Sequence, residues 1–211
     1  EAYQAMLTAE AYKLKLARGD SDHLHEYRLP VDAPVIRVEV AEAKPLSADV
    51  TGYTLRSLDG SPLPEWTAGA HLDIVIAPEF LRQYSMSGDP ADRSQYQIAV
   101  LREDQGRGGS KLMHRIFTPG RKIFISRPIN HFELAEDATK SLLMGGGIGV
   151  TPMIAFAHRL HALGRDFALH YSCSTRAAAG FARDLASMQW ADKVHLHLSD
   201  EGTRADLAGI M

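Results

Sequence analysis

Four glycines fall within five residues, in the stretch Gly145-Gly146-Gly147-Ile148-Gly149. The apolar run Ser141–Met144 precedes this glycine cluster, and the helical pattern Pro152–Leu163 follows it. Glycine lets a backbone approach a ligand closely, and a helix N-terminus offers free N–H groups and positive dipole charge. The cluster therefore predicts a strand-to-helix turn that binds a phosphate, with Thr151 as N-cap and Pro152 as the first helical residue. A tight turn without a ligand is the alternative, since the spacing is not G-x-G-x-x-G.

Strands and helices alternate from this region to the end of the chain. Such alternation produces right-handed βαβ units and a parallel sheet. We expect the last strand to lie at the sheet edge, and the α/β domain, residues 137–211, to be incomplete. In order, the predicted elements are strand Ser141–Met144, helix Pro152–Leu163, strand Phe167–Ser172, helix Ala177–Met188 and strand Val194–Leu198.

The chain before the cluster consists of short β-branched runs separated by turn residues, with one helical stretch, Gly109–Phe117. Several short strands at this spacing are typical of an antiparallel barrel or sandwich, and we expect a β barrel over residues 35–136. Residues 1–34 have helical spacing and then a charged, proline-containing stretch, which predicts a helix and a linker. The predicted strands are Val35–Ala41, Val50–Leu58, His71–Ile76, Leu81–Met86, Tyr96–Arg102 and Lys122–Arg127.

The composition excludes several classes of protein. The 211 residues suffice for one large domain or two small ones, and 45% apolar residues exclude global disorder. A formal charge of -3 gives no electrostatic reason to expect nucleic acid or an anionic membrane as a partner. No apolar run is long enough to span a membrane. No signal peptide opens the chain, so we expect a cytoplasmic protein, although the start at Glu1 is compatible with processing or truncation.

A single cysteine, Cys173, excludes an internal disulfide framework and a four-cysteine metal or iron–sulfur site within these residues. We expect Cys173 to be an inert packing residue at the end of a buried strand. Two histidine pairs, His23/His25 and His195/His197, each place two imidazoles on one side of an extended segment, which can bind zinc or copper. No third ligand has an evident place beside either pair, so we predict solvated strand residues and no metal site.

Two further stretches combine phosphate-binding and ring-binding side chains. In Arg82-Gln83-Tyr84-Ser85 the arginine can bind a phosphate, the tyrosine can stack on a planar ring and the serine can hydrogen-bond a ring nitrogen. Gly106-Arg107-Gly108-Gly109-Ser110 leads into a helix and supplies small residues, a cation and a helix start, which suit a second phosphate. Each stretch alone is weak evidence for a ligand site, because polar and aromatic strand faces are common.

Four motifs resemble, in their order along the chain, those of the phthalate dioxygenase reductase group of the ferredoxin-NADP reductase superfamily. They are the two stretches above, the segment Ile98-Ala99-Val100 between them, and the glycine cluster. The resemblance extends from Val35 to the end of the chain, and four motifs in the right order are more specific than any one. It implies a ferredoxin reductase-like fold, with a flavin barrel followed by a nicotinamide-nucleotide domain. It also implies a plant-type [2Fe–2S] ferredoxin domain, in a missing or separate part because its cysteines are absent here.

The resemblance further implies roles for individual residues. Ser85 would lie near the reactive N5 of the flavin and Thr151 where the nicotinamide meets it, and these two are the predicted catalytic residues, as positioning groups only. The compact Gly-Gly-Ser cradle resembles members that use FMN rather than FAD. The other predicted flavin-binding residues are Arg82, Gln83, Tyr84, Ile98, Ala99, Val100, Arg107, Gly108, Gly109, Ser110 and Asn130. Those predicted for the nicotinamide nucleotide are Gly146, Gly147, Gly149 and Arg176.

The chain departs from the family pattern in several places. Ser174-Thr175 precede Arg176 where the family has a second basic residue, and the Cys-Gly-Pro motif of a later strand is absent. Asp200 and Glu201 would repel a 2′-phosphate whereas Arg176 would attract it, and we predict NADH over NADPH. The N-terminal extension suggests a module joined to something upstream, as in haem-thiolate monooxygenases fused to their own reductase.

The sequence thus predicts an enzyme, an NADH-dependent FMN oxidoreductase. It would pass electrons through a [2Fe–2S] ferredoxin domain to an oxygenase, either haem-thiolate or Rieske. The cofactors carry the chemistry, and the protein supplies alignment, hydrogen bonds and water exclusion. Two alternatives stay open: a free flavin reductase or oxidase that needs no protein partner, and a non-enzymatic flavin- or nucleotide-sensing module.

Overall fold

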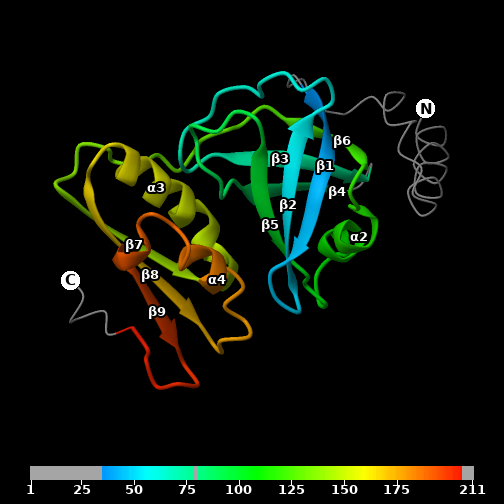
Figure 1. Ribbon diagram of the computed structural model, residues 1–211. Coiled ribbons are helices and arrows are strands. Elements are labelled where there is room, and N and C mark those ends of the chain that lie inside the picture. The colour runs from blue at the N-terminus through cyan, green and yellow to red at the C-terminus, as the bar shows by residue number, and fades with distance from the viewer. Residues whose placement is uncertain (1–34, 78–79, 206–211) are drawn as a thin grey trace, which may run out of the picture.

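The computed structural model describes residues 35–77 and 80–205, which form an antiparallel barrel joined to a three-stranded parallel sheet with helices (Figure 1). The predicted N-terminal helix and linker over residues 1–34, with His23 and His25, lie outside the described residues. In the part of the chain that is described, no helix has the length and apolar character needed to cross a membrane.

Six antiparallel strands form the barrel, in the order β4-β3-β6-β1-β2-β5. The edge strands β4 and β5 contact each other, so the barrel is nearly closed. Side chains alternate between core and surface in the first part of β3, where Leu72 and Ile74 are buried and His71 and Asp73 are partly exposed. The six predicted strands are confirmed, with small differences at their ends. Their bounds are β1 (Val35–Pro45), β2 (Val50–Ser57), β3 (His71–Ala77), β4 (Phe80–Ser85), β5 (Tyr96–Leu101) and β6 (Lys122–Ser126).

The predicted helix within the barrel chain is also present, as α2 (Gly109–Ile116). Its buried face carries Met113 and Ile116, and it contacts β3, β4 and β5. Beyond its end, Gly120 has a φ of 88°, which favours glycine, and the chain turns there into β6. Packing of this apolar face therefore places the N-terminus of α2 beside β4 and β5.

The parallel sheet has the order β7-β8-β9, as the alternation of strands and helices predicts. The helix α3 contacts β7 and β8 and buries Ile154, Ala155 and Leu160. The last strand lies at the edge, as predicted, with Leu198 buried. The elements are β7 (Lys140–Gly146), the 3-10 helix η2 (Gly147–Val150), α3 (Thr151–Ala162), β8 (Asp166–Cys173), α4 (Ala182–Leu185), the 3-10 helix η3 (Ala191–Lys193) and β9 (Val194–Leu198).

The predicted helix over 177–188 is wrong in extent, because only α4 is helical there. The Oγ1 of Thr175 accepts a hydrogen bond from the N–H of Ala178 (3.2 Å), which stabilises a turn instead of a helix. A Cβ on Gly180 would lie 3.0 Å from the Cβ of Leu46, so the chain passes against the barrel at a glycine. This tertiary contact overrides the helical spacing of the apolar residues.

The prediction that Thr151 is an N-cap is also wrong. The helix η2 runs directly into α3, so that Val150 occupies the N-cap and Thr151 is the first helical residue. The hydroxyl of Thr151 donates to the carbonyl oxygen of Ile148 at 3.0 Å. Because the glycine cluster itself adopts a 3-10 turn, the helical path begins at Gly147 rather than after the cluster.

The histidines of β9 differ from the solvated pair that we predict from the sequence. His195 is exposed, but the Nε2 of His197 lies 2.8 Å from the Nδ1 of His170 on β8, and its Nδ1 lies 3.0 Å from the carbonyl oxygen of Thr203. A carbonyl oxygen only accepts, so Nδ1 of His197 is the donor to Thr203, and in a neutral imidazole with this tautomer Nε2 accepts from His170. Burial and the two neighbouring imidazoles lower the pKa of His170. Cys173 is a buried free thiol, as predicted.

Candidate functional site

A cleft of about 490 Å³ lies between the barrel and the parallel sheet. One wall is formed by β4, β5 and the loop that leads into α2, and the other wall by the turn that joins β7 to α3. The cleft brings together residues from three of the predicted motifs and one residue of the fourth. The barrel contributes Arg82, Gln83, Tyr84, Ser85, Ala99, Leu101, Glu103, Arg107, Gly109 and Ser110, and the other wall consists of Ile148, Gly149, Thr151 and Pro152.

The strand β4 supplies four consecutive residues to the barrel wall. Gln83 is held by its amide, which donates to Asp73 on β3 at 2.9 Å. Tyr84 is half-buried, and burial raises the pKa of its phenol to about 12 despite the opposing charge of Arg82. Tyr84 is therefore a neutral side chain at physiological pH, suited to contact an uncharged ring.

The strand β5 separates the three residues that the resemblance assigns to the flavin. Ala99 lines the cleft together with Leu101, two positions later. Ile98 and Val100 point into the barrel core, where they are 1% and 0% exposed. The alternation of a β-strand explains the difference, because successive side chains point to opposite faces. The same alternation identifies Leu101 as a cleft residue that motif matching alone misses.

The start of α2 carries the Gly-Gly-Ser cradle, which we predict from the sequence to bind a phosphate. Gly108 occupies the N-cap with a φ of 92°, and no side chain caps the helix. The N–H groups of the first turn are thus not used by a capping side chain. Gly109 is buried, and a Cβ there would lie 3.2 Å from the Nε of Arg82, so glycine allows the guanidinium to approach the helix start.

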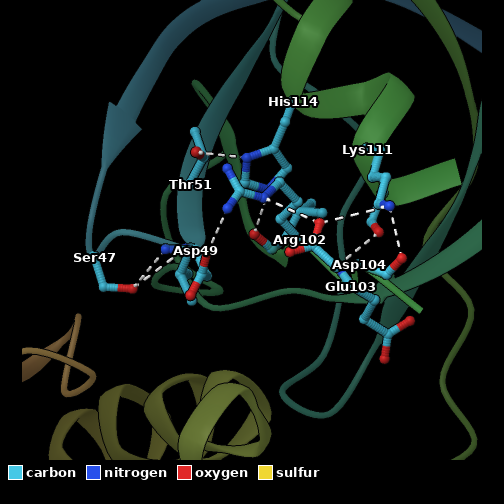
Figure 2. Close-up of polar contacts among 11 residues, drawn as sticks. Ser47, Asp49, Thr51, Arg102, Glu103, Asp104, Lys111 and His114 are labelled. Atoms are coloured by element: carbon cyan, nitrogen blue, oxygen red, sulfur yellow. Dashed lines mark hydrogen bonds and ion pairs between the residues drawn. The ribbon is translucent and has the colours of Figure 1, made fainter. Parts of the chain in front are cut away.

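A network of polar contacts behind this cradle holds the loop between β5 and α2 (Figure 2). Arg102 donates to Asp49 at 2.8 Å, and its Nε lies 3.7 Å from the carboxylate of Asp104. Lys111 on α2 donates to the main-chain oxygen of Asp104 at 2.6 Å. Ser110 accepts the N–H of Glu103 at 3.1 Å. The loop that carries Glu103 into the cleft is therefore attached at both ends.

The same network reaches the barrel through His114 on α2 (Figure 2). The Nε2 of His114 lies 2.9 Å from the carbonyl oxygen of Val100, which can only accept, so this nitrogen donates. In the neutral imidazole, Nδ1 then accepts from the hydroxyl of Thr51 at 3.3 Å. His114 thus attaches α2 to β5, the strand that presents Ala99 to the cleft.

The opposite wall is the glycine cluster. A Cβ on Gly145 would lie 2.5 Å from the Cα of Val150, so the turn closes on itself only with glycine at this position. Gly149 lines the cleft and has nothing within 4 Å of its Cβ direction. Thr151 is 5% exposed, and its hydroxyl proton is bound to Ile148, which leaves its oxygen as an acceptor toward a ligand.

Several predicted site residues lie outside the set that lines the cleft. Gly108, Gly146 and Gly147 flank it in sequence without lining it, and Gly146 and Gly147 are exposed. Asn130 donates to Thr67 and Ala68 on the barrel instead. Arg176 lines a separate cavity of about 620 Å³ beside α4. Conversely, the cleft is also lined by Glu103, Ile148 and Pro152, for which the sequence predicts no binding role. Ile148 lies within the glycine cluster, and Pro152 directly follows Thr151.

Curated proteins resemble this chain over most of its length, although no protein-family model matches it. The chain is 41% identical over 165 residues to the reductase subunit of the tert-butanol monooxygenase / tert-amyl alcohol desaturase of Aquincola tertiaricarbonis. The match covers 77% of this chain and 49% of that subunit. The chain thus spans about half the length of the curated relatives it matches.

Solved structures show the same arrangement of barrel and parallel sheet. Phthalate dioxygenase reductase has a TM-score of 0.79 at 32% identity, over 83% of this chain and 56% of that one. An intact type IV self-sufficient cytochrome P450 monooxygenase has a TM-score of 0.79 at 36% identity, over 92% of this chain and 26% of that one. With its ferredoxin reductase-like fold and these relatives, the chain is similar over most of its length to the phthalate dioxygenase reductase-like proteins, several of which are named as reductase subunits of oxygenases.

Proposed function

We propose that this chain is the flavin- and nicotinamide-binding part of an NADH-dependent reductase that serves an oxygenase. The observation that carries the proposal is the single cleft lined by both the β4–β5 wall and the glycine cluster. Hydride transfer requires two ring systems to be held in contact, about 3–3.5 Å apart. A cleft with one wall suited to a flavin and the other suited to a nucleotide meets this requirement.

The barrel wall fits a flavin mononucleotide on its own features. The uncapped start of α2, the room that Gly109 leaves beside Arg82, and the second cation Arg107 together suit a phosphate dianion. Tyr84 and Ala99 supply uncharged surface next to this charged end. A bound flavin would supply the capacity to accept a hydride and release electrons singly.

The residues that we propose to be catalytic act by orientation. Ser85 presents an aliphatic hydroxyl to the cleft from the end of β4, and it would hydrogen-bond a ring nitrogen. Thr151, whose own proton is bound to Ile148, would accept a hydrogen bond from the carboxamide of a nicotinamide. Neither side chain needs to transfer a proton, so both are positioning groups.

The choice of FMN and of NADH rests on two features of the structure. The cradle is formed by one helix start and its two adjacent arginines, which is enough for the single phosphate of FMN. Arg176, the residue that would attract a 2′-phosphate, is bound by both carboxylate oxygens of Glu201. This pairing supports NADH as the donor.

The proposed acceptor is a [2Fe–2S] ferredoxin domain that leads to an oxygenase, either haem-thiolate or Rieske. The chain has one cysteine, so such a cluster would be held outside these 211 residues. The resemblance to the self-sufficient cytochrome P450 monooxygenase supports a haem-thiolate partner, and that to phthalate dioxygenase reductase supports a dioxygenase. The domain division at residues 136/137 and a cytoplasmic location remain part of the proposal.

A spectroscopic experiment tests the proposal. The purified chain is incubated with FMN or FAD, desalted, and its visible spectrum recorded before and after anaerobic NADH. We expect stoichiometric FMN, weaker retention of FAD, and loss of the flavin absorbance with NADH. A chain that retains no flavin would contradict the proposal, and a chain that retains flavin without its reduction by NADH would favour the sensing module.

A further inference from the structure

The loop Thr67–Ala70, the segment that leaves the barrel after β6, and the helix α3 meet at one junction. Ile129, in that segment, exchanges two main-chain hydrogen bonds with His71 at the start of β3, at 2.9 and 3.0 Å. The segment is thus attached to the barrel immediately before it turns toward β7. Phe132, three residues later, contacts α3 through Phe156, with ring centroids 5.0 Å apart.

Asn130 uses its whole side-chain amide at this junction. Its Nδ2 donates to the hydroxyl of Thr67 at 2.7 Å and to the carbonyl oxygen of Ala68 at 3.0 Å. Its Oδ1 accepts the N–H of Phe132 at 2.9 Å, two residues on, which is an Asx-turn. One side chain therefore both shapes the turn and attaches it to the barrel loop.

Gly69 allows the barrel loop to approach the Phe132 segment and α3 closely. It has a φ of +95°, and a Cβ there would lie 1.8 Å from the carbonyl oxygen of Phe132 and 3.0 Å from the ring of Phe156. The barrel loop thus passes against the backbone of the segment and against α3 at the same point. No side chain larger than hydrogen leaves this arrangement in place.

Phe156 is 4% exposed and belongs to the helix that begins with Thr151 at the cleft. A shift of the Phe132 turn would therefore move α3, and with it the cleft wall of Gly149 and Thr151, relative to β4. A further contact between the two parts of the chain, the ion pair of Lys44 with Asp184 at 2.8 Å, is solvent-exposed and weak.

We propose that Asn130 is a positioning residue that fixes the distance between the two walls of the cleft, and so the alignment of nicotinamide with flavin. The inference rests on the proposed function, but it assigns Asn130 to the junction between the walls rather than to flavin binding. Misplacement of reacting groups by about 1 Å can cost 100-fold in rate. Loss of the Asn130 amide is therefore expected to slow hydride transfer while flavin binding persists.

The test compares Asn130→Ala with wild type and with Glu133→Gln, a change at an exposed position of the same segment. In the FMN-loaded chain we expect Asn130→Ala to retain FMN with an unchanged Kd and to be reduced by saturating NADH about 10- to 100-fold more slowly. Glu133→Gln should match wild type in both. Amide hydrogen exchange should show loss of protection at Phe132, the donor to Asn130, with protection retained at His71.

The outcomes separate the two proposals. If wild type binds no flavin or is not reduced by NADH, the proposed function fails, and the exchange measurement still tests the junction. If wild type is reduced and Asn130→Ala is reduced equally fast, or loses its FMN, the inference is overturned. If Asn130→Ala does not fold, Thr67→Val is used instead, because it removes one of the three hydrogen bonds of Asn130. Thr67→Val should be reduced more slowly than wild type, with a smaller loss of rate and full FMN content. An unchanged rate in Thr67→Val would overturn the inference.

Discussion

Arg176 and Glu201 form a bidentate ion pair. The Nε of Arg176 lies 3.0 Å from one carboxylate oxygen of Glu201, and its Nη2 lies 2.9 Å from the other. Arg176 follows β8 and Glu201 follows β9, so the pair joins the carboxyl ends of two adjacent parallel strands. A guanidinium bound in this way has two donors engaged, and the carboxylate repels any phosphate that approaches it. The arginine that resembles a determinant for NADPH is thereby occupied.

Replacing Glu201 with glutamine should shift the enzyme toward NADPH. The change removes the negative charge and frees Arg176 to bind a 2′-phosphate through charge-assisted hydrogen bonds, worth about 1.5–3 kcal/mol each. We expect the ratio of kcat/KM for NADPH to that for NADH to rise about 10-fold or more. Asp200→Asn, which removes a neighbouring charge that does not bond Arg176, is the control and should change the ratio less. An equal change in both variants would show that net charge, and not the pair, sets the preference.

Arg82→Ala should weaken flavin binding. The guanidinium lies beside the start of α2, where Gly109 leaves room for it, and a charge-assisted contact to a phosphate contributes about 1.5–3 kcal/mol. The Kd for FMN, measured by fluorescence quenching, should rise about 10- to 100-fold. Arg56→Ala is the matched control, because Arg56 is exposed on the barrel and donates to Gln95, away from the cleft. An unchanged Kd in Arg82→Ala would remove Arg82 from the phosphate site.

Tyr84 predicts a specific dependence of stability on alkaline pH. Burial raises the pKa of its phenol to about 12 in the folded chain, against about 10 in the unfolded one. As pH rises, the unfolded chain loses this proton first, so the contribution to stability is complete below about pH 10 and is lost between about 10 and 12. The Tm of Tyr84→Phe should therefore fall less steeply over this window than that of wild type. Parallel Tm curves would show that Tyr84 ionises normally in the folded chain.

The sequence predicted the architecture because each element has its own local pattern. Period-two alternation in β3 and β5, and the glycines of the turn after β7, specify strands and a turn without reference to distant residues. The helix over 177–188 could not be excluded in this way, because the contact that breaks it joins Gly180 to Leu46, from a different part of the fold. Helical spacing gives no information about such a contact.

The candidate site was predictable to a similar degree, and for a similar reason. Arg82, Ser85 and Gly149 line the cleft because each belongs to a short motif whose geometry is local. Asn130 was assigned to the flavin by resemblance alone, and its bonds to Thr67 and Ala68 depend on how the segment crosses the barrel loop. The role proposed for Asn130 depends on these long-range contacts, which a local sequence motif does not predict.

The two ends of the glycine cluster should respond to alanine in opposite ways. A Cβ on Gly145 would lie 2.5 Å from the backbone of Val150, and overpacking of this kind costs about 1–3 kcal/mol. A Cβ on Gly149 meets nothing within 4 Å, and alanine also lowers the entropy of the unfolded chain. We therefore expect the Tm to fall by roughly 3–10 °C in Gly145→Ala and to be unchanged or slightly higher in Gly149→Ala.

The same two variants should differ in their KM for NADH, and here Gly149→Ala should be the more impaired of the two. Gly149 lines the cleft, so its added methyl group occupies space that a nucleotide would use and should raise the KM for NADH several-fold at an unchanged FMN content. Gly145→Ala, measured well below its Tm, should have a KM closer to that of wild type, because Gly145 faces Val150 and not the cleft. Thermal unfolding and steady-state kinetics on both variants test this together. A KM that stays at the wild-type value in Gly149→Ala would mean that nicotinamide nucleotide does not bind against this turn.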